Sequence, residues 1–271
     1  MVNGQSRDTS SRAGSAGTLR ARAAALAVAL VGVAGCTDRS PQALFVQFNQ
    51  AVDRASSCVA RAGGQITRPI GWMDIGITNR YLLFPSVENG MPTSAEISGQ
   101  GPSTLRLENN TVQITGATVY YDIPEDIQAD LAENQGVEVP QGQFVFTSGS
   151  IEPGSTTVAV LEVVPPRVGE TLRLSKILSE RYATTQILVR VTVEAVMKDG
   201  DTVNSNEFVY PLNVCNGCLV FFPVLDCTLP PTEEVTLPCF PGQDEGVDCR
   251  ACYQLAVSKK EAALCLPPVK K

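Results

Sequence analysis

The chain has 271 residues, no histidine, and a formal net charge of −7 from 21 basic and 28 acidic side chains. This acidic balance, without a basic patch, repels a phosphate backbone, so we do not expect nucleic acid as a partner. Without histidine the chain cannot form a Ser-His-Asp or Cys-His nucleophile or a histidine-containing zinc site. It has neither a Walker loop nor a GxGxxG motif, and no cofactor is expected.

The N-terminal segment has the pattern of an export signal. A leader with four arginines precedes the thirteen uncharged residues from Ala23 to Gly35 (AAALAVALVGVAG). A helix that spans a bilayer needs about 20 apolar residues, whereas an export signal needs a shorter apolar run that ends in small residues. We therefore predict that residues 1–35 form a signal peptide. An uncleaved helix is the alternative.

The apolar run ends in VAGC, which is Val33 to Cys36. This ending resembles the lipobox of bacterial lipoproteins. In that family the cysteine is alkylated by diacylglyceryl and the preceding peptide bond is cut, which implies that Cys36 is the lipidated N-terminus of the mature protein. Two or three acyl chains anchor a protein stably to a membrane. Thr37 stands where enterobacterial inner-membrane lipoproteins have aspartate, so the resemblance implies sorting to the outer membrane.

The first expected element of the mature chain is an amphipathic helix after Ser40 and Pro41, which are a suitable N-cap and first helical residue. Apolar side chains recur at spacings of three and four, and Gly63-Gly64 can end the helix. The residues on this stripe are Leu44, Phe48, Val52, Ala55 and either Cys58 or Val59. The stripe predicts core packing, with a membrane-lying or partner-binding face as the alternative. Residues 36–64 are thus expected to form anchor, tether and helix.

Strands are expected next, at Met73–Pro85 and in a hairpin over Ser103–Ile123 that turns at Asn109-Asn110. A short helical insert follows at Pro124–Asn134. Its acidic side chains lack the spacing of a metal site and are expected to be solvated; they are Glu125, Asp126, Asp130 and Glu133. A second acidic run, Gln243–Asp248, lacks the alternation of an EF-hand loop, so no metal site is predicted there.

Further strands are expected at Phe144–Ser148 and Thr156–Val164, and the clearest pattern spans Thr185–Val214. There, alternate residues from Ile187 to Met197 are apolar, which is the period of a half-buried strand. Asp199-Gly200 suits the tight turn of a hairpin, and the return strand places Phe208, Tyr210, Leu212 and Val214 on one face. The pattern favours a mainly β fold, an immunoglobulin-like antiparallel sandwich over residues 65–226.

Eight cysteines remain after Cys36, and a cysteine-rich tail is expected at residues 227–271. In an exported chain an even number predicts disulfides. The eight are Cys58, Cys215, Cys218, Cys227, Cys239, Cys249, Cys252 and Cys265. A zinc ribbon made of the two CxxC pairs, Cys215/Cys218 and Cys249/Cys252, is the alternative, but the oxidising compartment disfavours it. A redox role is disfavoured because Cys215 and Cys218 follow strand-like sequence rather than opening a helix.

Parity restricts the pairing of these cysteines. Seven of the eight lie between Cys215 and Cys265, and seven is odd. If all eight are paired within one chain, one of the seven must bond to Cys58. Such a bond would close a loop of at least 157 residues, which is the separation of Cys58 and Cys215, and would join the N-terminal segment to the tail.

These patterns predict a lipid-anchored envelope lipoprotein with a non-catalytic structural or interaction role, not an enzyme. Its expected partners are a membrane and an envelope protein. The alternatives are a binding module for a small ligand or envelope polymer and, behind it, an enzyme that uses carboxylates. A deep pocket lined by several acids would favour the enzyme, whereas an exposed edge strand or apolar patch would favour partner binding.

Overall fold

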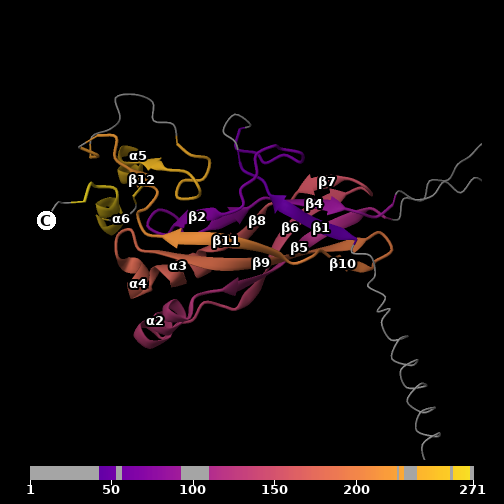
Figure 1. Ribbon diagram of the computed structural model, residues 1–271, viewed down its shortest axis with the longest axis horizontal. Coiled ribbons are helices and arrows are strands. Elements are labelled where there is room, and N and C mark those ends of the chain that lie inside the picture. The colour runs from indigo at the N-terminus through magenta and orange to yellow at the C-terminus, as the bar shows by residue number, and fades with distance from the viewer. Residues whose placement is uncertain are drawn as a thin grey trace, which may run out of the picture. The chain divides into compact units, whose positions relative to one another are not determined.

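The computed structural model describes residues 43–52, 57–92, 110–224, 226–228, 237–256 and 259–268 (Figure 1). Several sequence predictions lie outside these residues. They are the signal peptide, Cys36, the helix start at Ser40-Pro41, and the first strand and turn residue Asn109 of the hairpin over Ser103–Ile123. Within the described parts of the chain, no helix is both long and apolar enough to cross a membrane.

The largest sheet contains the strands that the sequence pattern predicts most clearly. Its order is β2 (Gly71–Asp74), β11 (Phe208–Cys215), β9 (Thr184–Met197), β5 (Val112–Asp122) and β6 (Gly142–Ile151), and β10 (Thr202–Asn204) pairs with β9. The inward-facing residues of β9 from Ile187 to Ala195 are at most 1% exposed, as their alternation predicts. The expected hairpin turn is confirmed, because Gly200 has a φ of 97°, which glycine adopts without strain.

Two smaller sheets share the core of the large one, and together the sheets curl like a half-barrel. The first contains β1 (Leu44–Asn49), β4 (Pro85–Asn89) and β7 (Thr156–Val158); the second pairs β3 (Tyr81–Leu83) with β8 (Leu161–Val164). The mainly β prediction is therefore confirmed. The fully antiparallel prediction is wrong at β2, which runs parallel to β11, and at the short strand Val220–Phe221, which pairs in parallel with Val247–Asp248. The immunoglobulin-like arrangement stays a prediction.

The helix predicted to follow Pro41 is wrong where the structure describes that segment. Leu44 and Val46 are buried while Phe45 and Gln47 face outward, so the segment alternates with a period of two and forms β1. Its aromatic and β-branched residues suit a strand that pairs with β4. Cys58 lies in a turn with a φ of 63°, not on a helical stripe. Pairing with β4 therefore determines the secondary structure of this segment, although its apolar residues also fit a helical spacing.

One predicted strand is interrupted in the structure, and two helices were not predicted. The long strand over Met73–Pro85 is broken, because the backbone N–H groups of Ile77 and Thr78 both donate to the carbonyl of Asp74 and turn the chain between β2 and β3. The helical insert is confirmed as α2 (Glu125–Gln135), whereas α3 (Pro166–Arg173) and α4 (Lys176–Ser179) were not predicted.

The tail folds around a small core of its own, in which four cysteines take part. It contains β13 (Val247–Asp248), α5 (Cys249–Leu255) and α6 (Lys259–Leu264), and β12 (Val220–Phe221), which precedes the predicted boundary at residue 227, packs with them. Figure 1 shows these elements gathered at one end of the large sheet. Asp248 begins α5, since its carboxylate accepts from the N–H of Arg250 at 2.9 Å and caps the helix.

Candidate functional site

All eight cysteines outside the predicted lipobox lie in disulfides. The pairs are Cys58–Cys239, Cys215–Cys218, Cys227–Cys249 and Cys252–Cys265. Parity predicted that Cys58 bonds to one of the last seven, and the structure pairs it with Cys239. The four cysteines of the zinc-ribbon alternative are divided among three bonds and do not meet as one ligand set. Their sulfurs are oxidised and offer no thiolate to a metal ion.

The four bonds differ in what they connect. Cys58–Cys239 joins residues 181 positions apart, and by loop-closure entropy such a bond contributes about 5 kcal/mol. Cys215–Cys218 spans a separation of only 3, for which the same relation gives about 2 kcal/mol. The first bond ties the N-terminal segment to the tail, and two others close the tail on itself. Cys215–Cys218 joins no separate segments.

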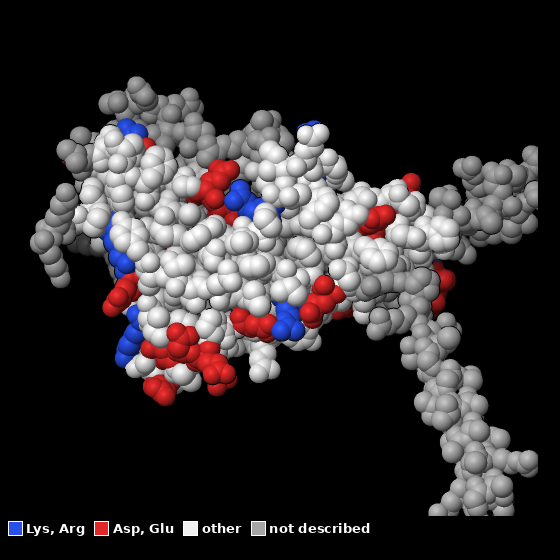
Figure 2. Space-filling model, in the orientation of Figure 1, with Lys and Arg blue, Asp and Glu red and all other residues white. Residues whose placement is uncertain are grey.

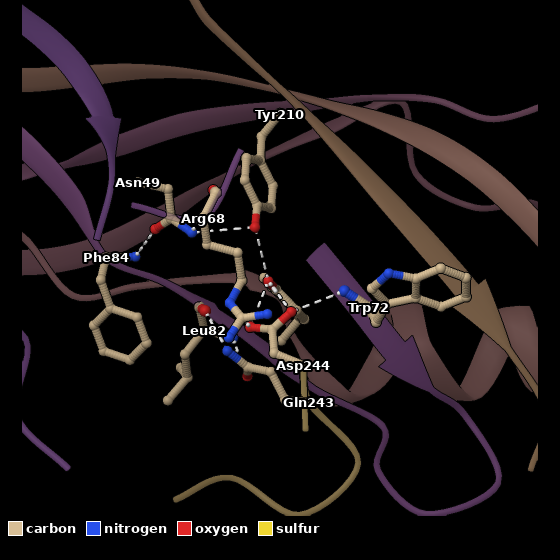
Figure 3. Close-up of polar contacts among 9 residues, drawn as sticks. Asn49, Arg68, Trp72, Leu82, Phe84, Tyr210, Gln243 and Asp244 are labelled. Carbon is tan, nitrogen blue, oxygen red and sulfur yellow. Dashed lines mark hydrogen bonds and ion pairs between the residues drawn. The ribbon is translucent and has the colours of Figure 1, made fainter. Parts of the chain in front are cut away.

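The tail docks on the sheets through Gln243 and Asp244. The N–H of Trp72 donates to the Asp244 carboxylate at 2.8 Å, and the N–H of Asp244 donates back to the Trp72 carbonyl at 2.8 Å. The Gln243 amide accepts from the N–H of Leu82 at 3.0 Å and donates to its carbonyl at 2.7 Å. The two residues thus satisfy backbone groups of β2 and β3 as an added strand would (Figure 3).

Two tyrosines extend this docking contact into the core. The hydroxyl of Tyr81 lies 3.0 Å from each Asp244 oxygen and 3.0 Å from the hydroxyl of Tyr210. Asn49 donates to the Tyr210 hydroxyl at 3.1 Å, and Arg68 pairs with Asp244 at 3.5 Å (Figure 3). We call Asn49, Arg68, Tyr81, Tyr210, Gln243 and Asp244 the tail-docking network. It links β1, β3, β11 and the tail.

Burial sets the protonation of the network. Burial raises the pKa of the Asp244 carboxyl, while the Trp72 N–H, Arg68 and Tyr81 oppose that rise. Burial, followed by the charge of Asp244, raises the pKa of Tyr81 well above its ordinary value, and burial raises the pKa of Tyr210 to about 12. Both tyrosines therefore keep their protons at neutral pH and act as hydrogen-bond donors. This arrangement suits a structural contact better than proton transfer.

A shallow pocket, whose empty space of about 300 Å³ includes open solvent, lies beside the network. It is lined by Gln50, Val52, Arg68, Phe84, Cys239, Phe240, Gln243, Asp244 and Glu245. The rings of Phe84 and Phe240 stack with centroids 5.6 Å apart, and the side-chain nitrogen of Gln50 is buried without a hydrogen-bond partner among the described residues. The pocket has two acidic side chains, Asp244 and Glu245, and Asp244 already serves the docking contact.

The acidic helix is a solvated surface with one exception. Glu125, Asp126 and Glu133 are exposed, and Figure 2 shows acidic side chains gathered where Figure 1 places α2. Asp130 is instead buried and accepts from the Ser175 hydroxyl and the Lys176 N–H, both at 2.7 Å. These hydrogen bonds, Ser175 first, lower its pKa. The prediction of solvation is wrong for Asp130, which holds the start of α4.

A second buried carboxylate holds the CNGC loop, residues 215–218. Asp74 has no exposed surface and accepts from the N–H groups of Gly217 at 2.7 Å, Leu219 at 2.9 Å and Gly76 at 3.0 Å. Burial raises the pKa of Asp74, and the three N–H groups and Arg173 oppose the rise. The carboxylate and both sulfurs of the loop lie within 4.8 Å of one another.

Sequence reasoning missed Asp74 and the tail-docking network. The signal for Asp74 was a carboxylate inside the apolar run GWMDIGI, since a buried charge needs hydrogen-bond partners. For Tyr210 the pattern placed the ring on the inward face of its strand, but it could not show that its hydroxyl meets that of Tyr81.

The outer face of β5 and β6 carries exposed aromatic side chains. Phe146 is 86% exposed, Tyr120 51% and Phe144 39%. The rings of Phe144 and Phe146 meet at 4.9 Å. A side chain on Gly116 or Gly142 would strike Phe144 or Tyr120, so each of these rings packs against a glycine of the neighbouring strand. Beyond β5, no other strand of the described chain pairs with β6. We call Tyr120, Phe144 and Phe146 the aromatic patch.

Comparison with known proteins gives this chain no relatives: no protein-family model matches it, and no curated protein sequence matches it. The function must be argued from the geometry.

Proposed function

We propose that this protein is an exported lipoprotein of the cell envelope, anchored in the outer membrane through lipid on Cys36, with a non-catalytic structural or interaction role. Four disulfides support export, because such bonds persist in oxidising compartments. The VAGC ending of the signal supports the lipid anchor. The immunoglobulin-like arrangement belongs to this proposal, as a rigid β scaffold that presents a binding face.

The observation that carries the interaction role is the aromatic patch. Phe146 lies almost wholly in solvent on a strand, so apart from its contact with Phe144 its ring gains little from burial in the fold of its own chain. Large exposed aromatic side chains are enriched where proteins meet their partners. The patch lies at the end of the large sheet, on β6 and its neighbour β5. We propose another envelope protein as the partner that covers it.

The pocket beside the tail-docking network favours the second candidate function. The stacked rings of Phe84 and Phe240 offer an apolar wall, and the Gln50 amide offers a buried donor. The pocket is shallow and open to solvent, so these groups suit a small chemical group with one hydrogen-bond acceptor rather than an enclosed ligand.

The lipid anchor is tested by replacing Cys36. In the Cys36→Ala variant we expect no lipidation and no cleavage before residue 36, because both steps need the cysteine. The precursor should accumulate, or the protein should leave the membrane fraction. Acyl labelling and fractionation of the cells measure both effects. Normal processing with unchanged membrane association would show that VAGC is no lipobox.

The partner role of the aromatic patch is tested by photocrosslinking in the envelope. A benzoylphenylalanine residue in place of Phe146 should give one adduct of defined mass, whereas the same analogue in place of exposed Glu133 on α2 should not. Phe144→Ser in the first protein should reduce the adduct several-fold, because it removes the neighbouring ring. Equal adducts at both positions, or none at Phe146, would contradict the proposed contact.

A further inference from the structure

The Cys215–Cys218 bond is distinct among the four disulfides. Each of the others joins residues between 13 and 181 positions apart, whereas this bond links two residues of one tight loop. The loop follows β11 rather than opening a helix, which disfavoured a redox role on sequence grounds, so the case for such a role depends on Asp74 and on the unequal access of the two sulfurs. From its surroundings we infer that this bond is a thiol–disulfide exchange site for an external dithiol, with Asp74 as the proton carrier for Cys215.

The two sulfurs differ in access. Cys215 ends β11 between β2 and β9 and has no exposed surface, whereas Cys218 is half-buried. A thiolate from outside therefore reaches Cys218 first, and Cys215 is the leaving sulfur. Stepwise exchange requires this asymmetry. Cys218 forms the mixed disulfide with the dithiol, and Cys215 remains available to attack that mixed disulfide in the reverse direction.

The loop is held in place by bonds that do not depend on the disulfide. The Asp74 carboxylate accepts from Gly217 and Leu219, the two residues that flank Cys218. The Cys215 carbonyl accepts from the N–H of Ile75 at 2.7 Å, and the Asn216 side chain donates to the Ser179 carbonyl at 2.9 Å. When the S–S bond opens, these contacts keep the sulfurs near each other. Reduction is thus reversible without refolding.

The exchange balances as two displacements. A thiolate of the dithiol attacks the Cys218 sulfur, the S–S bond breaks, and its electron pair leaves on the Cys215 sulfur, which takes a proton from Asp74. The second thiolate of the dithiol then attacks its own sulfur in the mixed disulfide and releases Cys218 as a thiolate, which is protonated by water. The dithiol is oxidised by two electrons and the protein pair is reduced. In the reverse direction the Asp74 carboxylate removes the Cys215 proton.

Charged groups around the loop support this role for Asp74. Its carboxylate lies within 4.8 Å of both sulfurs and shares the buried side of the loop with Cys215. Arg173 of α3 acts on Asp74 electrostatically and favours its charged form. Arg181 lies against Gly217 and donates to the carbonyls of Leu264 and Leu266, while its Nε atom is buried without a hydrogen-bond partner among the described residues. A cation beside the loop stabilises thiolate in the reduced pair.

The test is a redox titration of the mature protein with dithiothreitol and its oxidised form, followed by alkylation and peptide mapping. We expect Cys215 and Cys218 to become alkylated together while the other three bonds stay closed and the circular dichroism is unchanged. Oxidised dithiothreitol should then restore the bond. The inference is overturned if this pair opens only together with the others, or only when the protein unfolds.

Asp74→Asn tests the proton carrier. It should slow re-oxidation at least about tenfold, since general acid–base catalysis commonly contributes more than that. Asp130→Asn is the matched control, because the buried Asp130 also accepts hydrogen bonds from a separate segment, the start of α4, but is not part of the Cys215–Cys218 site. The re-oxidation rate of the wild type should fall more steeply toward acidic pH than that of Asp74→Asn, because a protonated Asp74 cannot remove the proton of Cys215. Equal rates and profiles in all three proteins would remove Asp74 from the exchange.

A second pair of variants keeps the test independent of that substitution. Cys215→Ser leaves the half-buried Cys218 as a free thiol, and Cys218→Ser leaves the buried Cys215. With glutathione disulfide, the first variant should form a mixed disulfide at least tenfold faster than the second. Equal rates, or a faster Cys218→Ser variant, would contradict the assigned order of attack.

Discussion

Replacing Cys58 and Cys239 together with serine is expected to lower the free energy of unfolding by about 5 kcal/mol, the largest effect of any single disulfide in this chain. The bond spans 181 positions, and its loss frees the unfolded chain far more than the loss of a short loop does. Urea unfolding of wild type and variant, followed by tryptophan fluorescence of Trp72, measures the difference.

The double variant Cys215→Ser, Cys218→Ser is the matched control for this first prediction. It also removes two sulfurs and one bond, but its separation of 3 predicts a loss of only about 2 kcal/mol. The expectation fails if both double variants lose the same stability. It also fails if the tail of the Cys58/Cys239 variant unfolds separately at low urea without changing the main transition, because the bond would then hold the tail alone.

Local patterns predicted well wherever one face of a strand meets the core. The alternation from Ile187 to Ala195 required a buried strand, and Asp199-Gly200 required a turn there, so both followed from the sequence. Parity likewise placed the partner of Cys58 in the last third of the chain. It left seven partners open, because the choice of Cys239 depends on where the tail docks.

The errors have a common physical origin in pairing between distant segments. Leu44–Asn49 satisfies a helical spacing and a strand alternation about equally, and pairing with β4 decided for the strand. The Asp74 turn that breaks the Met73–Pro85 run depends on Gly217 and Leu219, more than 140 positions away. A single sequence shows neither contact. The same holds for the hydroxyls of Tyr81 and Tyr210, whose meeting depends on strand order.

The bond from Cys58 and the tail-docking network act at one junction. Cys239 lies four positions before Gln243 and lines the same pocket as Gln243 and Asp244. The disulfide therefore fixes the tail close to the β2 edge, and the hydrogen bonds of Gln243 and Asp244 then fix its register. We expect the two contributions to be coupled, because the same short segment supplies both.

Asp244→Ala is the second change expected to have a large effect, with a loss of about 3 kcal/mol in the free energy of unfolding. The substitution leaves the buried Tyr81 hydroxyl and Arg68 without their shared acceptor, and a buried group left unpaired costs more than its hydrogen bond contributes. Glu133→Ala, which removes an equal charge from an exposed site on α2, is the control and should change stability by less than about 0.5 kcal/mol.

The pH dependence of the Asp244→Ala stability deficit distinguishes the loss of buried hydrogen bonds from the loss of the ion pair with Arg68. Burial raises the pKa of Asp244 above its ordinary value of 3.8, so the folded protein binds this proton more tightly than the unfolded chain does. The stability that Asp244 contributes through this shift is complete below that ordinary value and is lost as the pH rises through the folded pKa. The deficit of Asp244→Ala should therefore be larger at pH 4 than at pH 7. A deficit that grows toward neutral pH would mean that the ion pair with Arg68 outweighs burial, and that the tail is held by charge rather than by the tyrosine hydrogen bonds.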